Sequence, residues 1–166
     1  MPGVSSVDVR VVLGDLLQLE ADVLAVKHAQ GFHQSDGQVV ERLEAAGLSR
    51  ASVEAVPGEA RLFPSNGAVG AREVLFVGTV PISELGYHDV RRFAGDVLAA
   101  LQPHPTPVRT LVLTVHGVNC GLDEGEAALA LVGGLIDGLQ RGKAPGTLER
   151  ITIVERREGR ALRFQH

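Results

Sequence analysis

The stretch RTLVLTVHGVNCGLDEGEAALALVGGL, residues 109–135, places a glycine-rich corner between a strand pattern and a helix pattern. RTLVLTV is almost continuously apolar, which predicts a buried strand over 109–115. A helix is expected from about Glu124, because apolar residues then recur on one helical face. The members of that face are Ala128, Leu131, Val132, Leu135 and Leu139. A strand followed at once by a returning helix is the building unit of a parallel sheet.

The rest of the chain supplies further strands and helices of the same kind. Residues 90–101 carry apolar side chains at helical spacing, and a shorter helix over about 39–46 is stopped by Gly47. The remaining strand patterns cover 7–11, 21–26, 59–63, 73–78 and 151–155. Strands and helices alternate in the second half, whereas two strands follow each other directly in the first half. We therefore expect an α/β fold, a three-layer α/β/α sandwich with a mixed, mostly parallel central sheet.

Composition narrows the class of protein. The 166 residues suit one domain, 1–166, and 45% hydrophobic against 22% charged residues is typical of a globular chain. The net charge is −4 and the cations are scattered, so we expect no duplex nucleic acid partner. No apolar run approaches the roughly 20 residues of a membrane helix, so no membrane partner is expected. The abrupt ending REGRALRFQH is compatible with a module excised from a longer protein.

Cysteine usage and the N-terminus bear on location. The sequence holds one cysteine, which cannot form an internal disulfide, and it begins with no charged and apolar signal pattern. Both features favour a cytoplasmic location. The six histidines show none of the usual metal-binding spacings, so we expect no metal site and no cofactor.

The glycine-rich corner has two interpretations. In open α/β sheets, ligands bind beyond the carboxyl ends of the strands, and glycines there let backbone N–H groups approach a phosphate. Alternatively, the glycines only turn the chain, and Asp123 with Glu126 forms the start of a capped helix. The carboxylates of Asp123 and Glu124, which stand at the helix start, would repel a phosphate on the helix axis, so an anion would have to be held by the amides of residues 117–121. Spacing leaves both interpretations open.

Several short motifs resemble those of macro domains. Gly14-Asp15-Leu16, followed by the strand ADVLAV at 21–26, resembles the family's opening turn and strand. Ser35-Asp36-Gly37-Gln38-Val39, running into a helix that ends in Ala45-Ala46-Gly47, resembles its first glycine-bearing binding loop. The strand REVLFVGTVP resembles its middle strand, and the glycine-rich corner sits where the family has its second phosphate loop.

The non-catalytic N-terminal domain of leucyl aminopeptidases, which shares this fold, is a second resemblance. Gly58-Glu59-Ala60, the strand VLFVG at 74–78 and the segment DVRRFAG at 89–95 are all similar to that version. It implies an oligomerisation or scaffold domain without a ligand.

The macro-domain resemblance implies a binding site for ADP-ribose or a cyclic or conjugated derivative. Asp15 would accept a hydrogen bond from the adenine amine, and Leu16 would supply a neighbouring amide. Ser35, Gly37 and Gln38 would flank one phosphate. The second phosphate and distal ribose would lie against His116, Gly117, Val118, Asn119, Cys120 and Gly121. The partner would be a small nucleotide, with an attached effector domain or a second copy as further partners.

Two departures from the family pattern bear on catalysis. Hydrolytic members usually carry an asparagine at the end of the second strand, where this chain has Lys27, His28 and Ala29. The corner at 117–121 is one residue longer than the usual Gly-x-x-Gly. We therefore expect a ligand-sensing module without catalytic residues. The alternatives are an ADP-ribosyl hydrolase and the ligand-free scaffold.

Several of these candidate site residues also have a purely structural interpretation. Asp15 could be a turn former rather than an adenine acceptor. Lys27 and His28 could contact phosphate as cleft residues or be solvated strand-end residues. Cys120 and His116 would make a nucleophile pair only within hydrogen-bond reach and with an orienting third group, which spacing does not reveal.

Overall fold

The computed structural model describes residues 6–32, 35–115 and 122–155. Their central element is a six-stranded sheet in the order β1-β6-β5-β2-β4-β3. The strands are β1 (Asp8–Leu13), β2 (Ala21–His28), β3 (Ala60–Pro64), β4 (Ala71–Gly78), β5 (Thr110–Leu113) and β6 (Arg150–Glu155). The helices are α1 (Ser35–Ala45), α2 (Tyr87–Leu101) and α3 (Glu124–Gln140), with short 3-10 turns at Arg50–Val53 and Ile82–Glu84.

Most of the sheet is parallel. β1 pairs with β6 from Asp8↔Arg150 to Leu13↔Glu155, so the first strand lies beside the last strand of the sequence. β2 lies between β5 and β4 and is parallel to both. Only β3 runs antiparallel, to β4. The mixed sheet of the sequence prediction is thereby confirmed.

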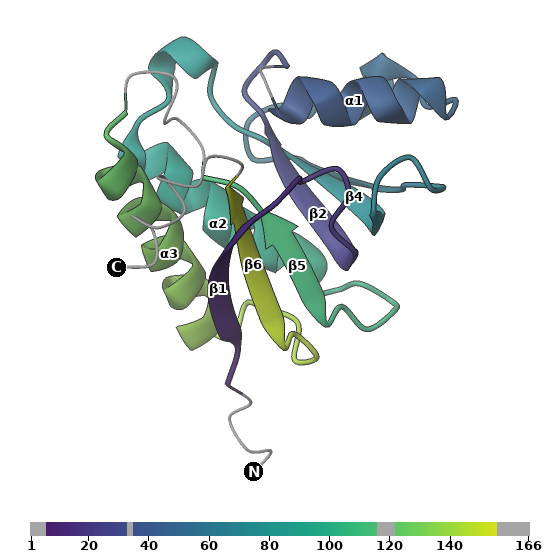
Figure 1. Ribbon diagram of the computed structural model, residues 1–166. Coiled ribbons are helices and arrows are strands. Elements are labelled where there is room, and N and C mark those ends of the chain that lie inside the picture. The colour runs from purple at the N-terminus through teal and green to yellow at the C-terminus, as the bar shows by residue number, and fades with distance from the viewer. Residues whose placement is uncertain (1–5, 33–34, 116–121, 156–166) are drawn as a thin grey trace.

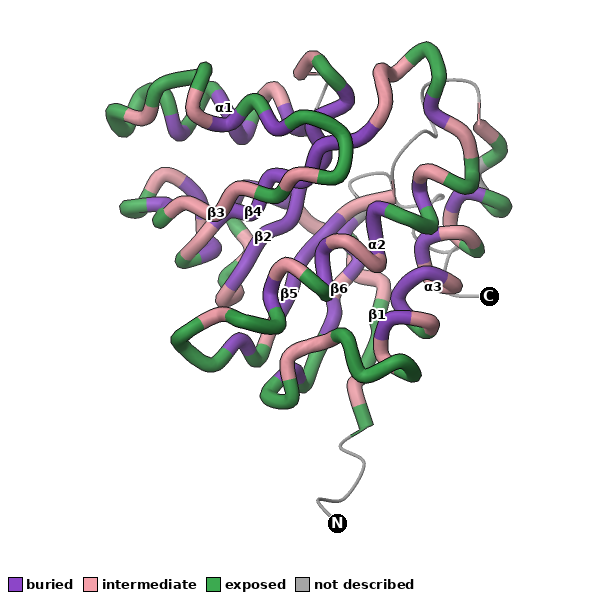
Figure 2. Tube along the Cα trace, turned by 180° about the vertical axis from the view of Figure 1, so that it is seen from behind, coloured by how far each residue is buried: buried purple, intermediate pink, exposed green. Residues whose placement is uncertain are grey.

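The helices cover the sheet in layers (Figure 1). α1 lies on one side, where Val39, Val40 and Leu43 pack with Leu24 and Phe76 of the sheet. α2 and α3 lie on the other side and enclose a second core built on alternate residues of the same strands. Figure 2 shows buried residues along the inner strands and the inward sides of the helices. The predicted three-layer arrangement is therefore confirmed.

Local capping follows the sequence closely at α3. Asp123 Oδ1 accepts a hydrogen bond from the Glu126 N–H at 3.0 Å, which satisfies an amide of the first helical turn. The Tyr87 hydroxyl accepts a second bond from the Asp123 N–H at 2.9 Å and joins the starts of α2 and α3. The start of α1 differs from the expectation: residues 35–37, expected in a loop, already belong to the helix.

The two helices α2 and α3 cross at glycine. A Cβ added at Gly134 would lie 2.2 Å from the Arg91 carbonyl oxygen, and one at Gly138 would lie 2.7 Å from a Leu98 methyl carbon. At Gly134 the neighbour is backbone, which leaves no room for a side chain, so glycine there lets the two backbones approach. Gly95 in α2 differs, because nothing lies within 4 Å of an added Cβ there.

We predict that Gly134→Ala lowers the free energy of unfolding by about 2 kcal/mol or more, since the methyl group meets backbone that cannot move alone. The matched control Gly95→Ala should raise it by about 0.5–1 kcal/mol, because alanine favours helix where space is open. Urea unfolding measures both. Equal effects of the two substitutions would contradict this account of the helix crossing.

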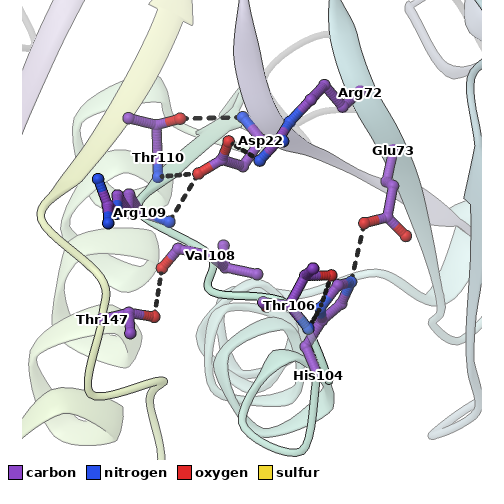
Figure 3. Close-up of polar contacts among 9 residues, drawn as sticks. All are labelled: Asp22, Arg72, Glu73, His104, Thr106, Val108, Arg109, Thr110 and Thr147. Atoms are coloured by element: carbon purple, nitrogen blue, oxygen red, sulfur yellow. Dashed lines mark hydrogen bonds and ion pairs between the residues drawn. The ribbon is translucent and has the colours of Figure 1, made fainter.

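At the amino ends of the strands, Asp22 of β2 holds β5 in place (Figure 3). Its Oδ2 accepts from the N–H groups of Arg109 (2.7 Å) and Thr110 (3.1 Å). Its own N–H donates to Thr110 Oγ1 at 2.9 Å, and Arg72 of β4 pairs with the carboxylate. Burial by itself raises the pKa of Asp22, but these hydrogen bonds and the Arg72 guanidinium outweigh burial and hold the pKa below its usual value.

A carboxylate with a lowered pKa stabilises the fold above its unfolded pKa and loses that contribution as pH falls through the folded value. We predict that Asp22→Asn costs about 1–2 kcal/mol at neutral pH, because two amides lose a charged acceptor. The difference from the unsubstituted protein should shrink below about pH 4. Denaturant unfolding at neutral and acidic pH tests this, and a difference that grows on acidification would contradict it.

Candidate functional site

The candidate site lies at the carboxyl ends of β2 and β4, the edge where open α/β sheets hold ligands. The segments that leave these two strands stay hydrogen bonded to each other. The Thr79 N–H donates to the His28 carbonyl at 2.9 Å, and the Ile82 N–H donates to the Ala29 carbonyl at 3.2 Å. Backbone hydrogen bonds therefore hold the two connecting segments side by side beyond the end of the sheet.

A buried ion pair joins β2 to the first turn of α1. Lys27 Nζ lies 3.0 Å and 3.2 Å from the two carboxylate oxygens of Asp36. Their side chains are 6% and 5% exposed. Two charges so far from water are tolerated only when each neutralises the other, because either one alone would carry a large desolvation cost. The pair therefore fixes the start of α1 at the carboxyl edge of the sheet.

His28, the last residue of β2, points into the protein. Its Nδ1 lies 2.8 Å from the Ala55 carbonyl oxygen. A carbonyl can only accept, so Nδ1 carries a proton. The ring also packs against Phe32, with 4.8 Å between ring centroids. Both His28 and Lys27 are about 5% exposed, which excludes the interpretation that they are solvated strand-end residues.

Gln30 completes the turn that follows β2. Its φ of 57° lies in the left-handed region, which costs a residue other than glycine some strain. The side-chain amide offsets that strain by donating to the carbonyls of Ala55 (3.1 Å) and Thr79 (3.0 Å). This side chain thus ties the turn after β2 to the segment after β4.

Gly78 ends β4 against a neighbouring loop. A Cβ there would lie 1.9 Å from the Val56 carbonyl oxygen. The Gly58 N–H donates to the Gly78 carbonyl at 3.1 Å, and the Gly78 N–H donates to the backbone carbonyl of Glu59 at 2.8 Å. Only glycine permits this approach, and the loop closes the outer flank of the edge.

Comparison with known proteins identifies the fold. No protein-family profile matches the sequence, and no curated protein sequence matches it. Solved structures do match. A macrodomain of Trypanosoma brucei in complex with ADP has a TM-score of 0.74 at 17% identity, covering 95% of this chain and 67% of its own. The same macrodomain in complex with ADP-ribose has a TM-score of 0.74 at 16% identity, covering 99% and 70%.

A macrodomain of Oceanobacillus iheyensis with MES bound has a TM-score of 0.72 at 14% identity, covering 93% of this chain and 87% of its own. The chain has the macrodomain fold. The resemblance drawn from short sequence motifs is thereby confirmed at the level of fold.

Within the macrodomain fold, the structure brings together one half of the predicted cleft. Lys27, His28 and the first turn of α1 meet at the carboxyl edge. In that turn Gln38 is exposed and Gly37 is half-buried. An added Cβ at Gly37 would find its nearest neighbour, Phe32, at 3.9 Å, so this position is not crowded.

The other half of the predicted cleft lies outside the described residues. It comprises His116, Gly117, Val118, Asn119, Cys120 and Gly121, and the side chain of Ser35 is likewise not described. Their roles stay predictions. So does the possibility of a Cys120–His116 pair.

Asp15 adopts the turn-forming role. Its Oδ1 accepts from the Leu17 N–H at 2.9 Å, and its carbonyl accepts from the N–H groups of Gln18 and Leu19. Leu16 is 7% exposed and packs in the α1-side core. The adenine contacts proposed for Asp15 and Leu16 stay predictions.

Two residues of this edge, Gln30 and Asp36, lie within the predicted cleft segment 27–38 but are not among the individually predicted site residues. Gln30 gives no recognisable signal, because its role depends on carbonyls 25 and 49 residues further along. Asp36 stands at a position where acidic residues favour a helix start, which is a signal that could have been used.

Residues 6–32, 35–115 and 122–155 contain neither a metal-ligand cluster nor a membrane-spanning helix. In those ranges no three His, Cys, Asp or Glu side chains cluster closely enough to hold a metal ion. None of the helices described there has the length and apolar character needed to cross a membrane.

We predict that Lys27→Met and Asp36→Asn each lower the free energy of unfolding by about 3 kcal/mol, since each removes the opposite charge from beside a buried one. The double substitution should cost clearly less than the sum of the two, because no charge then remains buried. A double-mutant cycle by denaturant unfolding measures the coupling. Strictly additive effects would show that the pair does not fix the start of α1.

Proposed function

We propose that this macrodomain-fold protein binds ADP-ribose or a cyclic or conjugated derivative. The cleft would be formed by residues 14–16, 27–38 and 116–122. The observation that carries the proposal is the buried Lys27–Asp36 pair, which fixes the first turn of α1 at the carboxyl edge of the sheet. The complexes of the Trypanosoma brucei macrodomain with ADP and ADP-ribose support the same ligand class.

The electrostatics of that turn favour a phosphate. The N–H groups of a helix's first turn have no partner within the helix, and the macrodipole places partial positive charge there. The Asp36 carboxylate alone would repel an anion, but Lys27 neutralises it at 3.0 Å. A phosphate beside Gly37 and Gln38 would therefore meet the amides and the dipole rather than a net negative charge.

The other site residues take distinct roles in this proposal. Asp15 would accept a hydrogen bond from the adenine amine through its carboxylate. Lys27 and His28 would act as positioning residues, because their polar atoms already contact Asp36 and Ala55. Residues 116–121 would supply amides to the second phosphate and the distal ribose.

The proposed activity is binding without hydrolysis. The positions where hydrolytic members carry an asparagine are occupied here by Lys27, His28 and Ala29, which are all buried. Incubation with a mono-ADP-ribosylated protein tests this point. Release of free ADP-ribose in proportion to protein concentration would establish a hydrolase instead.

A ligand-free scaffold is the second candidate, and one observation favours it. The polar side chains at the end of β2, Lys27, His28 and Gln30, all bond to other parts of the protein. Side chains that are all engaged in internal hydrogen bonds and ion pairs are also what a purely structural role would require. Isothermal titration with ADP-ribose distinguishes the two candidates. We expect a saturable binding heat that fits one site, whereas no heat at millimolar ADP-ribose would favour the scaffold function.

Asp15→Asn tests base recognition without breaking the turn. Asparagine retains an oxygen that can accept from the Leu17 N–H, but its second group donates and cannot accept from the adenine amine. We predict that ADP-ribose binds about tenfold more weakly, a loss of about 1.4 kcal/mol. Ribose 5-phosphate, which lacks the base, serves as the control ligand and should bind both proteins equally. Equal ADP-ribose affinity would remove Asp15 from the site.

A further inference from the structure

A groove of about 370 Å³ runs between α2 and α3 on the side of the sheet opposite α1. It is bordered by both helices and by the segment that leaves α3. The helix crossing explains its origin. Glycine at 134 and 138 lets the helices approach closely, and Gly95 leaves open space where α2 borders the groove.

The groove is basic although the chain as a whole carries a net charge of −4. Among the residues that the structure describes, four cations line it and two carboxylates oppose them. The cations are Arg91, Arg92, Arg141 and Lys143, and the carboxylates are Asp96 and Asp137. A local excess of two positive charges in a concave surface attracts anions, because a groove concentrates the field of its walls.

The internal pairing leaves part of this charge unmatched. Asp137 is held by Arg91 in an ion pair. Arg92 donates to His88 Nε2 at 3.2 Å, which is a neutral acceptor in that contact. Within the described residues, Arg141 makes no side-chain ion pair.

Asp96 opposes the remaining cations only weakly. Its carboxylate receives no hydrogen bond from the described part of the chain, and it interacts with Arg92 and Lys143 through charge alone. Burial raises the pKa of Asp96, and these two cations only partly offset that rise. The oxygen atoms of a bound anion would accept hydrogen bonds from Arg92, Arg141 and Lys143, which the Asp96 carboxylate does not do.

We propose that this groove is a second, separate binding site for a small anion with a terminal phosphate group that carries two negative charges. The phosphates of ADP-ribose are internal and carry one charge each, so ADP-ribose is not a ligand of this kind. The groove volume suits a small ligand rather than an extended chain, since small-molecule pockets begin near 300 Å³. Planar guanidinium groups bind phosphate oxygens in pairs, and Lys143 adds a point charge. The groove lies on the side of the sheet opposite α1, and we expect binding there to be independent of the first turn of α1.

Isothermal titration of the full chain with inorganic pyrophosphate, at low ionic strength, tests the proposal. Saturating ADP-ribose is included in one arm so that the carboxyl-edge cleft is occupied. With the cleft occupied by ADP-ribose, we expect one pyrophosphate binding event, in the groove, whose affinity falls as salt is added. Succinate, a dianion without phosphate, should bind at least about fivefold more weakly if bidentate guanidinium contacts matter.

Two variants locate the binding event. Arg141→Gln/Lys143→Gln removes two groove charges and should weaken pyrophosphate binding about fivefold or more. Arg42→Gln/Arg109→Gln is the matched control, because it removes two exposed charges outside the groove and should leave binding unchanged. Gly95→Glu, which adds a carboxylate where space is open, should abolish binding while keeping every cation.

Three results would overturn the proposal. They are no saturable heat with pyrophosphate, equal weakening in the groove and control variants, and full competition by ADP-ribose. The last would place pyrophosphate in the nucleotide cleft. Loss of ADP-ribose binding with pyrophosphate binding intact would instead refute the nucleotide cleft and leave the groove site standing.

Discussion

The electrostatic contact between Lys27 and Asp36 sets the geometry on the α1 side of the sheet. One partner ends a central strand and the other begins a helix, and each is almost fully removed from water. Neither charge can be buried without the other, so strand end and helix start are positioned together. The conformation of the first turn of α1, and with it the proposed phosphate contact, depends on this pair.

Close backbone approach is the second constraint, and it acts on both sides of the sheet. Gly78 brings the loop near Val56 onto the end of β4, and Gly134 brings α3 onto α2. The first closes one flank of the proposed cleft, and the second creates the basic groove. Both proposed anion sites thus lie beside glycines that allow two main-chain segments to come close together. They differ in charge source: amides and a helix dipole at the edge, and guanidinium groups in the groove.

Much of the fold could be predicted because it depends on local patterns. The spacing of apolar residues predicted the position of each strand and α-helix that the structure describes. The spacing of Asp123 and Glu126 predicted the N-cap of α3, which the structure confirms. Nonlocal pairing was less accessible. A lysine at a strand end is usually solvated, and nothing in the sequence indicates that Lys27 is covered by a residue nine positions later. The same holds for Gln30, whose partners lie on two distant segments.

The most direct test of the central claim is a ¹⁵N–¹H NMR titration with ADP-ribose. The account predicts saturable shifts concentrated in the amides of residues 35–38 and 116–121, with the amides of Arg141 and Lys143 unchanged. Those signals report on the peptide groups that would hold the phosphates, whatever the affinity. An unchanged spectrum at millimolar ligand, or shifts confined to the groove between α2 and α3, would contradict it.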